Sequence, residues 1–212
     1  MGTIKQGILG GFSGKVGSVV GASWKGIAYM RSQADHVKNP RSAAQNYHRE
    51  AIKEITNFLQ PLASTLRITF GEYAQKMSAF NKAVSVNYHK CLKAVDGHPE
   101  IDYEKIVVSR GSLKKFSDAT AGDFEMEHEM RFITWGDNET VTTYPGMMLI
   151  IYDCDAKVWH VWQYDQPFTS QEMILLDSDW YSPNFTTSSW ALVWDKATGK
   201  VSDPIECPIL FG

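Results

Sequence analysis

The chain opens with MGTIKQGILGGFSGKVGSVVGASWKGIAYMRS, residues 1–32, which hold eight of the protein's 16 glycines and no acidic residue. Most of the apolar residues between these glycines are β-branched or aromatic. Glycine loses more backbone entropy on folding than any other residue and has no side chain to pack. We therefore expect a glycine-rich arm or hairpin that is ordered by lying on another surface, either the rest of this chain or a neighbouring copy.

Within this arm, residues 16–19 and 24–27 are expected to form two short strands joined by a glycine-rich turn. A helix with glycines along one side is the alternative, and it is disfavoured because each glycine costs a helix about 1 kcal/mol. A phosphate-binding loop at Gly14 is excluded, because that motif needs a glycine where Leu9 stands and a serine or threonine where Val16 stands.

Two helices are expected after the arm. In residues 42–59 apolar side chains recur at steps of three and four, which predicts an amphipathic helix that Pro61 interrupts. Residues 78–95 predict a second helix, ended by the sequence DGHP at 96–99. Such a helical hairpin must bury its apolar face against something. We assign residues 1–99 to one domain that contains the arm and the helical hairpin.

Beyond residue 99 the apolar residues tend to alternate with polar ones, which is the pattern of β-strands. The expected strands include residues 147–153, 158–164 and 188–195, separated by polar turns. About six or seven such strands predict an antiparallel, immunoglobulin-like β-sandwich over residues 100–212. The predicted fold class is therefore α+β.

Charge is distributed unevenly along the chain. Residues 1–117 contain 17 Lys and Arg against 8 Asp and Glu, a net charge of +9, whereas residues 118–212 contain 4 against 16, a net charge of −12. A basic front and an acidic back can meet head to tail between identical subunits. The same basic front could instead face nucleic acid, or the charges could be spread over the surface and only aid solubility.

The residue pattern predicts no catalytic, cofactor or metal site, and we expect no enzymatic activity. The three cysteines are far apart and odd in number, so no disulfide framework is expected, and the six histidines lack the paired spacing of metal ligands. No uncharged apolar run approaches the ~18 residues of a membrane span, and no signal peptide is recognisable at the amino terminus. A cytoplasmic protein is expected on these grounds.

Three segments carry a resemblance to a known family. They are KQGILGGFSGKVGSVVGASWKGIAYMRS at 5–32, FNKAVS at 80–85, and FITW at 132–135 with Asp137 and Asn138. Together they are similar to a domain-of-unknown-function family that is common in Bacteroidota and in elements derived from their phages. The resemblance implies a helical front, a β-sandwich back and no assigned catalytic residue. A phage-encoded member would be a component of the virion.

The first functional hypothesis is a structural subunit of a phage particle, such as a ring, collar or tail component. It would pack head to tail on copies of itself and on other structural proteins, in a virion assembled in the host cytoplasm. The arm would dock on a neighbour by strand addition. The residues expected at this assembly interface are Lys5, Lys15, Trp24, Lys25 and Arg31.

A carbohydrate- or surface-binding module is the alternative hypothesis. Exposed aromatic rings in the β-rich half would form its ligand platform. The residues proposed for it are Trp159, Trp162, Trp180 and Tyr181. A nucleic-acid binder that acts through the basic front is a third and less favoured hypothesis, and it predicts an affinity that falls steeply with salt.

Overall fold

The computed structural model describes residues 3–4, 11–24, 27–35, 39–123, 130–135, 141–170, 172–176 and 187–211. Contacts within the chain divide it into two compact units, Met1–Ser42 and Ala43–Gly212. We call the first the N-terminal unit and the second the body, and each is described by itself.

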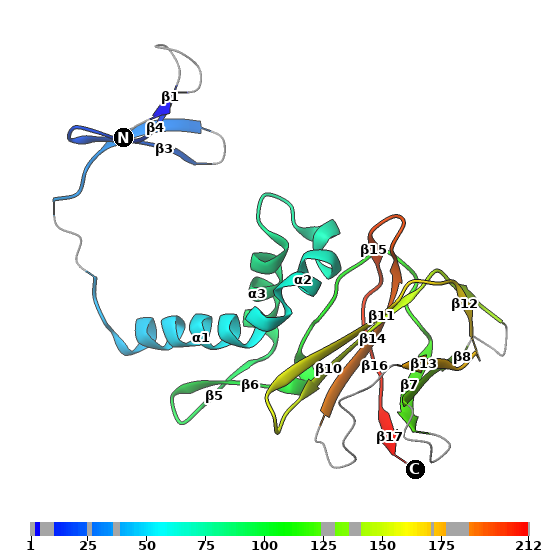
Figure 1. The fold of residues 1–212 in the computed structure, drawn as a ribbon. Helices are drawn as coiled ribbons and strands as arrows, with labels where there is room; N and C mark the ends of the chain where they lie inside the picture. Colours follow the sequence, from blue (N-terminus) through cyan, green and yellow to red (C-terminus); the bar gives the residue numbers. More distant parts are fainter. Residues whose placement is uncertain are drawn as a thin grey trace. The chain divides into compact units, whose positions relative to one another are not determined.

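The N-terminal unit is an antiparallel sheet, drawn in blue in Figure 1. Its strands are β1 (Thr3–Ile4), β2 (Phe12–Val16), β3 (Val19–Trp24) and β4 (Ile27–Ser32), and they lie in the order β1-β2-β3-β4. Strand β4 is therefore an edge strand of this sheet. The glycine-rich segment is a meander of strands, with two more strands than the expected hairpin.

The expected strand at residues 16–19 is wrong, because Gly17 and Ser18 form the turn between β2 and β3. The expected strand at 24–27 is wrong as well, because Trp24 ends β3 and its register partner Ile27 begins β4. A two-residue hairpin turn requires positive φ, which Gly17 supplies at 59°. At Gly21 the close approach of a neighbouring strand, and not the backbone conformation, requires glycine. A Cβ added there would stand 2.1 Å from the carbonyl oxygen of Phe12. The start of β2 therefore passes too close to β3 for any side chain at that position.

The body begins with a helical layer. It contains α1 (Ala43–Leu59), the 3-10 turn η1 (Gln60–Leu62), α2 (Ala63–Thr69), the 3-10 turn η2 (Gly71–Tyr73) and α3 (Ala79–Lys90). Pro61 lies in the first turn of η1, where its missing N–H costs nothing, so the chain continues as helix on both sides of it. The start of α3 was correctly predicted, and the Ser78 hydroxyl caps it by accepting the Asn81 N–H at 3.1 Å.

The predicted end of that second helix at residue 95 is wrong. The helix stops at Lys90, and the hairpin of β5 (Leu92–Val95) and β6 (His98–Ile101) follows. Asp96 and Gly97 have φ of 49° and 83°, the conformation of a two-residue hairpin turn. An Asp-Gly pair serves this turn as readily as a helix end, and here it joins two strands. The short turn η3 (Tyr103–Lys105) comes next.

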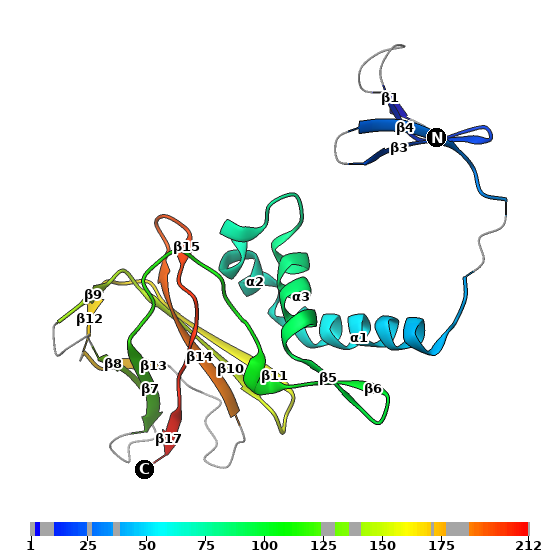
Figure 2. The same cartoon turned by 180° about the vertical axis from the view of Figure 1, so that it is seen from behind.

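The largest sheet of the body has the strand order β11-β10-β14-β15, with β16 also paired to β14. We call it the central sheet. Its strands are β10 (Met147–Asp153), β11 (Val158–Tyr164), β14 (Thr187–Asp195), β15 (Lys200–Val201) and β16 (Ile205–Glu206), drawn in yellow to red in Figures 1 and 2. All its pairings are antiparallel, and every residue of β10 is buried.

A second sheet of four strands has the order β13-β8-β7-β17. Its members are β7 (Asp118–Asp123), β8 (Met130–Trp135), β13 (Ile174–Leu176) and β17 (Ile209–Phe211), and only the β7–β17 pairing is parallel. The strands β9 (Thr143–Tyr144) and β12 (Phe168–Thr169) form a separate antiparallel pair.

Two hydrophobic cores lie on the two faces of β10 and β14. On one face Met148, Ile150 and Leu192 share a core with helical residues that include Ile55, Leu59 and Leu66. On the other face Met147, Leu149 and Val193 share a core with Phe116, Phe132 and Phe168. The body is therefore layered as helices, central sheet and second sheet.

The mixed α+β class is confirmed, while the immunoglobulin-like form of the sandwich is not. An immunoglobulin-like sandwich has its core between two sheets and turns the other face of each sheet outward. Here the helical layer covers the second face of the central sheet, which explains why β10 reads MMLIIYD without alternation.

Candidate docking surface

One face of the N-terminal sheet combines basic and apolar side chains. The strand register places Lys15 opposite Val20, and Val20 opposite Arg31. Directly opposed residues in an antiparallel sheet project from the same face, and so do alternate residues along a strand. Ile27 and Tyr29 therefore project from the same face as Arg31. We call Lys15, Val20, Ile27, Tyr29 and Arg31 the basic face.

The described apolar side chains of this sheet are not buried within the unit. Among the side chains described between residues 11 and 35, no apolar one is buried. All six residues of β4 are exposed, with Ile27 at 67% and Met30 at 70%. Val16, on β2, is 55% exposed. Ile27 lies on the basic face, whereas Val16 and Met30 project from the opposite face, so the sheet exposes apolar side chains on both faces. A sheet is independently stable when it packs a hydrophobic face, and exposed apolar side chains are a property of surfaces that bind partners.

The structure brings together part of the expected interface set. Lys15 and Arg31 lie on the basic face, and both are exposed. Trp24 ends β3 at the register position opposite Ile27, and Lys5 and Lys25 lie outside the described residues. Sequence reasoning overlooked Ile27, Tyr29 and Met30. The apolar run IAYM at 27–30 was the signal that could have identified them.

The expected ligand platform is not brought together. Trp159 and Trp162 lie on opposite faces of β11, since one packs against the helix-side core and the other against the second core. The Trp159 Nε1–H donates to the carbonyl oxygen of Phe58 at 3.0 Å, and its ring centroid lies 5.0 Å from that of Phe58. Trp159 therefore attaches the central sheet to α1. Trp180 and Tyr181 lie outside the described residues.

One hollow of the body is an open groove of about 1290 Å³ beside η3 and β14. Basic and acidic side chains both line it, among them Lys93, Arg110, Asp102 and Glu206. Asp102 accepts a hydrogen bond from Lys105 at 2.7 Å, and this bond lowers the pKa of the Asp102 carboxyl below its usual value. An ionised carboxylate with an ammonium partner is not poised to act as an acid.

The cysteine thiols are poor nucleophiles. Burial raises the pKa of Cys91 and of Cys207 to about 12, and it also raises the pKa of Cys154 in the wall of the groove. The thiolate is the reactive form, and these shifts disfavour it at neutral pH. Within the described part of the chain, no group of three or more His, Cys, Asp and Glu residues could hold a metal ion.

A second groove, of about 460 Å³, runs along the edge strand β11 of the central sheet. Pro61, Leu62, Ser64 and Thr65 of the helical layer form its other wall.

In the portion of the chain that the structure describes, the helices are too short or too polar to cross a bilayer.

Comparison with curated proteins and with solved structures finds no match. A family model, in contrast, matches residues 11–151. The match runs from β2 through the N-terminal sheet and the whole helical layer to Ile151 in β10. The glycine-rich segment and the helices thus fall within one family model, and the resemblance to a domain-of-unknown-function family is confirmed. The chain belongs to a family of unknown function, DUF6266.

Proposed function

We propose that this protein is a non-enzymatic structural subunit that assembles head to tail with copies of itself. The N-terminal sheet of one subunit would dock on the body of the next. One observation carries the proposal, namely that no described apolar side chain of residues 11–35 is buried within the N-terminal unit. Burying such side chains against a partner is favourable by about 25 cal/mol per Å² of apolar surface.

Charge supports a second copy of this chain as the partner. Residues 1–42 carry 6 Lys and Arg against 1 Asp or Glu, a net charge of +5. Residues 43–212 carry 15 against 23, a net charge of −8, and the two values sum to the −3 of the whole chain. The N-terminal unit of one copy and the body of another therefore attract each other.

Repetition of such a contact is heterologous, because the two surfaces that meet are different. Heterologous contacts generate rings when the rotation closes and open fibres when it does not. Both outcomes suit a ring, collar or tail component of a phage virion. We propose more specifically that the protein is such a virion component. The resemblance to a family found in phage-derived elements supports this.

The test replaces two exposed apolar residues of β4 in the full chain. The variant Ile27→Asp/Met30→Asp should weaken self-association by roughly tenfold or more, because it puts charges where apolar contact is proposed. Light scattering across a concentration series, on nuclease-treated protein, measures the change. The matched control is Ser18→Asp/Gln33→Asp, which adds the same charge at exposed polar positions of the same unit.

The control should assemble as the wild type does. A wild-type protein that stays monomeric at all concentrations would contradict the proposal. Equal assembly by the wild type and the Ile27→Asp/Met30→Asp variant would contradict it as well.

A further inference from the structure

We infer that the basic face of the N-terminal sheet binds single-stranded nucleic acid. This inference goes beyond the proposed function, because it gives one face of the sheet a partner that is not a copy of this chain. The opposite face stays available for contact with a second copy. The inference depends on how the strand register separates charged from uncharged side chains.

The register places both charged residues of the sheet on one face. Strands β1 to β4 contain two charged residues, Lys15 and Arg31, and each lies opposite Val20 in a neighbouring strand. Both therefore project from the basic face, two strand spacings or about 10 Å apart. Both are exposed.

The opposite face is uncharged and is partly covered by the chain itself. Val16 lies opposite Val19 on this face, and Met30 lies there opposite Gly21. Residues 11 and 12 cross the same face, since a Cβ added to Gly11 would stand 2.4 Å from the Cβ of Ala28, two strands away. This face suits apolar contact with protein and offers no cation to a phosphate.

An exposed aromatic ring accompanies the two cations. Tyr29 is 45% exposed and precedes Arg31 by two residues, so it projects from the basic face beside it. Sheets that bind single strands use this combination, in which bases stack on exposed aromatic rings while Lys and Arg contact the phosphates. Tyr29 is thus placed to stack on a base, and Lys15 and Arg31 to contact the backbone on either side of Val20.

The sign of the charge favours a polyanion over an acidic protein surface. The first 34 residues contain four Lys and Arg and no Asp or Glu. A nucleic acid is negative at every nucleotide and repels any carboxylate at the interface. The body of a second copy instead carries 15 Lys and Arg among its 23 Asp and Glu, and a surface built for it alone would be expected to include carboxylates.

The test measures binding of a fluorescein-labelled 20-nucleotide oligo(dT) to the full chain by anisotropy, at 0.05 to 0.3 M sodium chloride. Lys15→Gln/Arg31→Gln should weaken binding by roughly tenfold or more at 0.05 M. It should also make the slope of log K against log salt shallower by about 1.4, because each phosphate contact on a single strand contributes about 0.7. The matched control is Lys53→Gln/Lys115→Gln, which removes the same charge at exposed positions of the body and should bind as the wild type does.

Tyr29 is tested separately from the charges. Tyr29→Ala should weaken binding by roughly fivefold or more with the salt slope unchanged, because a stacking contact is lost and no phosphate contact is. Tyr29→Phe keeps the ring and should bind as the wild type does. Equal loss of affinity in the Lys15→Gln/Arg31→Gln variant and in the body control would overturn the inference, and so would full affinity in Tyr29→Ala.

The outcome is distinguishable from that of the proposed function. A wild-type protein that assembles after nuclease treatment but does not bind the oligonucleotide would overturn the inference and leave the proposed function standing. A protein that binds the oligonucleotide in the expected way but stays monomeric without it would sustain the inference and contradict the proposed function.

Discussion

Gly111 illustrates how single residues permit the close contacts in the body. The segment after η3 crosses β15 there, and an added Cβ would stand 1.8 Å from the carbonyl oxygen of Val201. Two backbone hydrogen bonds hold the crossing, from Arg110 N–H to the Thr69 oxygen at 2.9 Å and from Leu113 N–H to the Val201 oxygen at 3.0 Å. Any side chain at position 111 would push these partners apart.

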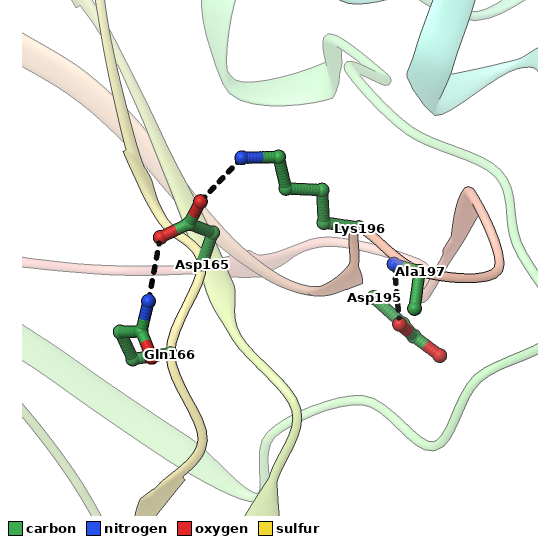
Figure 3. A network of polar contacts seen from close by, with 5 residues as sticks. All are labelled: Asp165, Gln166, Asp195, Lys196 and Ala197. Carbon is green, nitrogen blue, oxygen red and sulfur yellow. Dashed lines mark hydrogen bonds and ion pairs between the residues drawn. The ribbon is translucent and has the colours of Figure 1, made fainter.

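The turn between β14 and β15 contains Lys196, which forms an ion pair with Asp165. Figure 3 shows Lys196 reaching Asp165, with an Nζ–Oδ2 distance of 2.5 Å, while Asp195 accepts the Ala197 N–H at 2.9 Å. The hydrogen bond from Lys196 lowers the pKa of Asp165. The hydrogen bond from Thr198 is the main cause that lowers the pKa of Asp195.

We predict that Lys196→Met raises the pKa of Asp165 toward its ordinary value and leaves that of Asp195 unchanged. A carboxyl whose folded pKa is depressed stabilises the fold above its unfolded pKa, and this contribution is lost as pH falls through the lower folded pKa. The free energy of unfolding of the variant should therefore fall less steeply as the pH drops below the ordinary pKa of aspartate. Carboxyl carbon shifts followed from pH 2 to pH 7 measure both groups in one sample. An unaltered Asp165 titration in the variant would contradict the pairing.

At the scale of elements, Asn87 joins α3 to the extended segment that follows η3. Its side-chain amide donates to the carbonyl oxygens of Ala83 at 3.0 Å and Val107 at 2.9 Å, and its Oδ1 accepts the Val107 N–H at 2.8 Å. Asn87 is fully buried, so these bonds satisfy groups that water cannot reach. They fix the end of the helical layer against the strand-like segment that passes to the second sheet.

Asn87→Ala should lower the free energy of unfolding by about 2–3 kcal/mol. The substitution leaves the N–H and the oxygen of Val107 without their side-chain partner and also creates a small cavity. Urea unfolding followed by tryptophan fluorescence measures the change. Asn81→Ala is the matched control, because Asn81 is exposed on the first turn of the same helix, and it should change stability by about 0.5 kcal/mol or less. A loss in Asn87→Ala no larger than in this control would show that the three bonds do not stabilise the helix.

At the scale of the whole molecule, function is proposed to depend on two units with opposite charge. The N-terminal unit carries a net charge of +5 and the body −8. In this proposal the exposed apolar residues of β4 would supply short-range contact. The charges would supply attraction at longer range, and that attraction would be the part that is sensitive to salt.

We predict that self-association of the wild-type protein weakens as the salt concentration rises. Screening shortens the range of the attraction from about 10 Å at 0.1 M salt to about 3 Å at 1 M. Sedimentation velocity from 0.05 to 1 M sodium chloride, after nuclease treatment, measures the effect. Association that strengthens with salt throughout this range would mean that apolar burial alone drives assembly. Association that disappears after nuclease treatment would point to nucleic acid as the partner of the basic face.

The elements encoded by local pattern could be predicted from sequence alone. Apolar spacing predicted α1 and the start of α3, and polar turns between apolar runs predicted β10, β11 and β14. Lys15 and Arg31 were predicted to lie at an assembly interface, and that role stays a prediction, while the structure places both exposed on one face of the sheet. The glycine-rich segment also predicted membership of its family.

Only the tertiary structure decided how these elements meet, because strand pairing and core packing join residues that are distant in the chain. The sequence DGHP suits a helix end and a hairpin turn equally, and pairing with β6 selected the hairpin at Asp96 and Gly97. The run MMLIIYD predicts a buried strand. The structure shows why both of its faces are buried, because the helices cover one face and Phe116 and Phe132 lie in the core on the other. The edge positions of β4 and β11 likewise follow from strand order, which no local pattern encodes, since an edge is defined by the neighbour that a strand lacks.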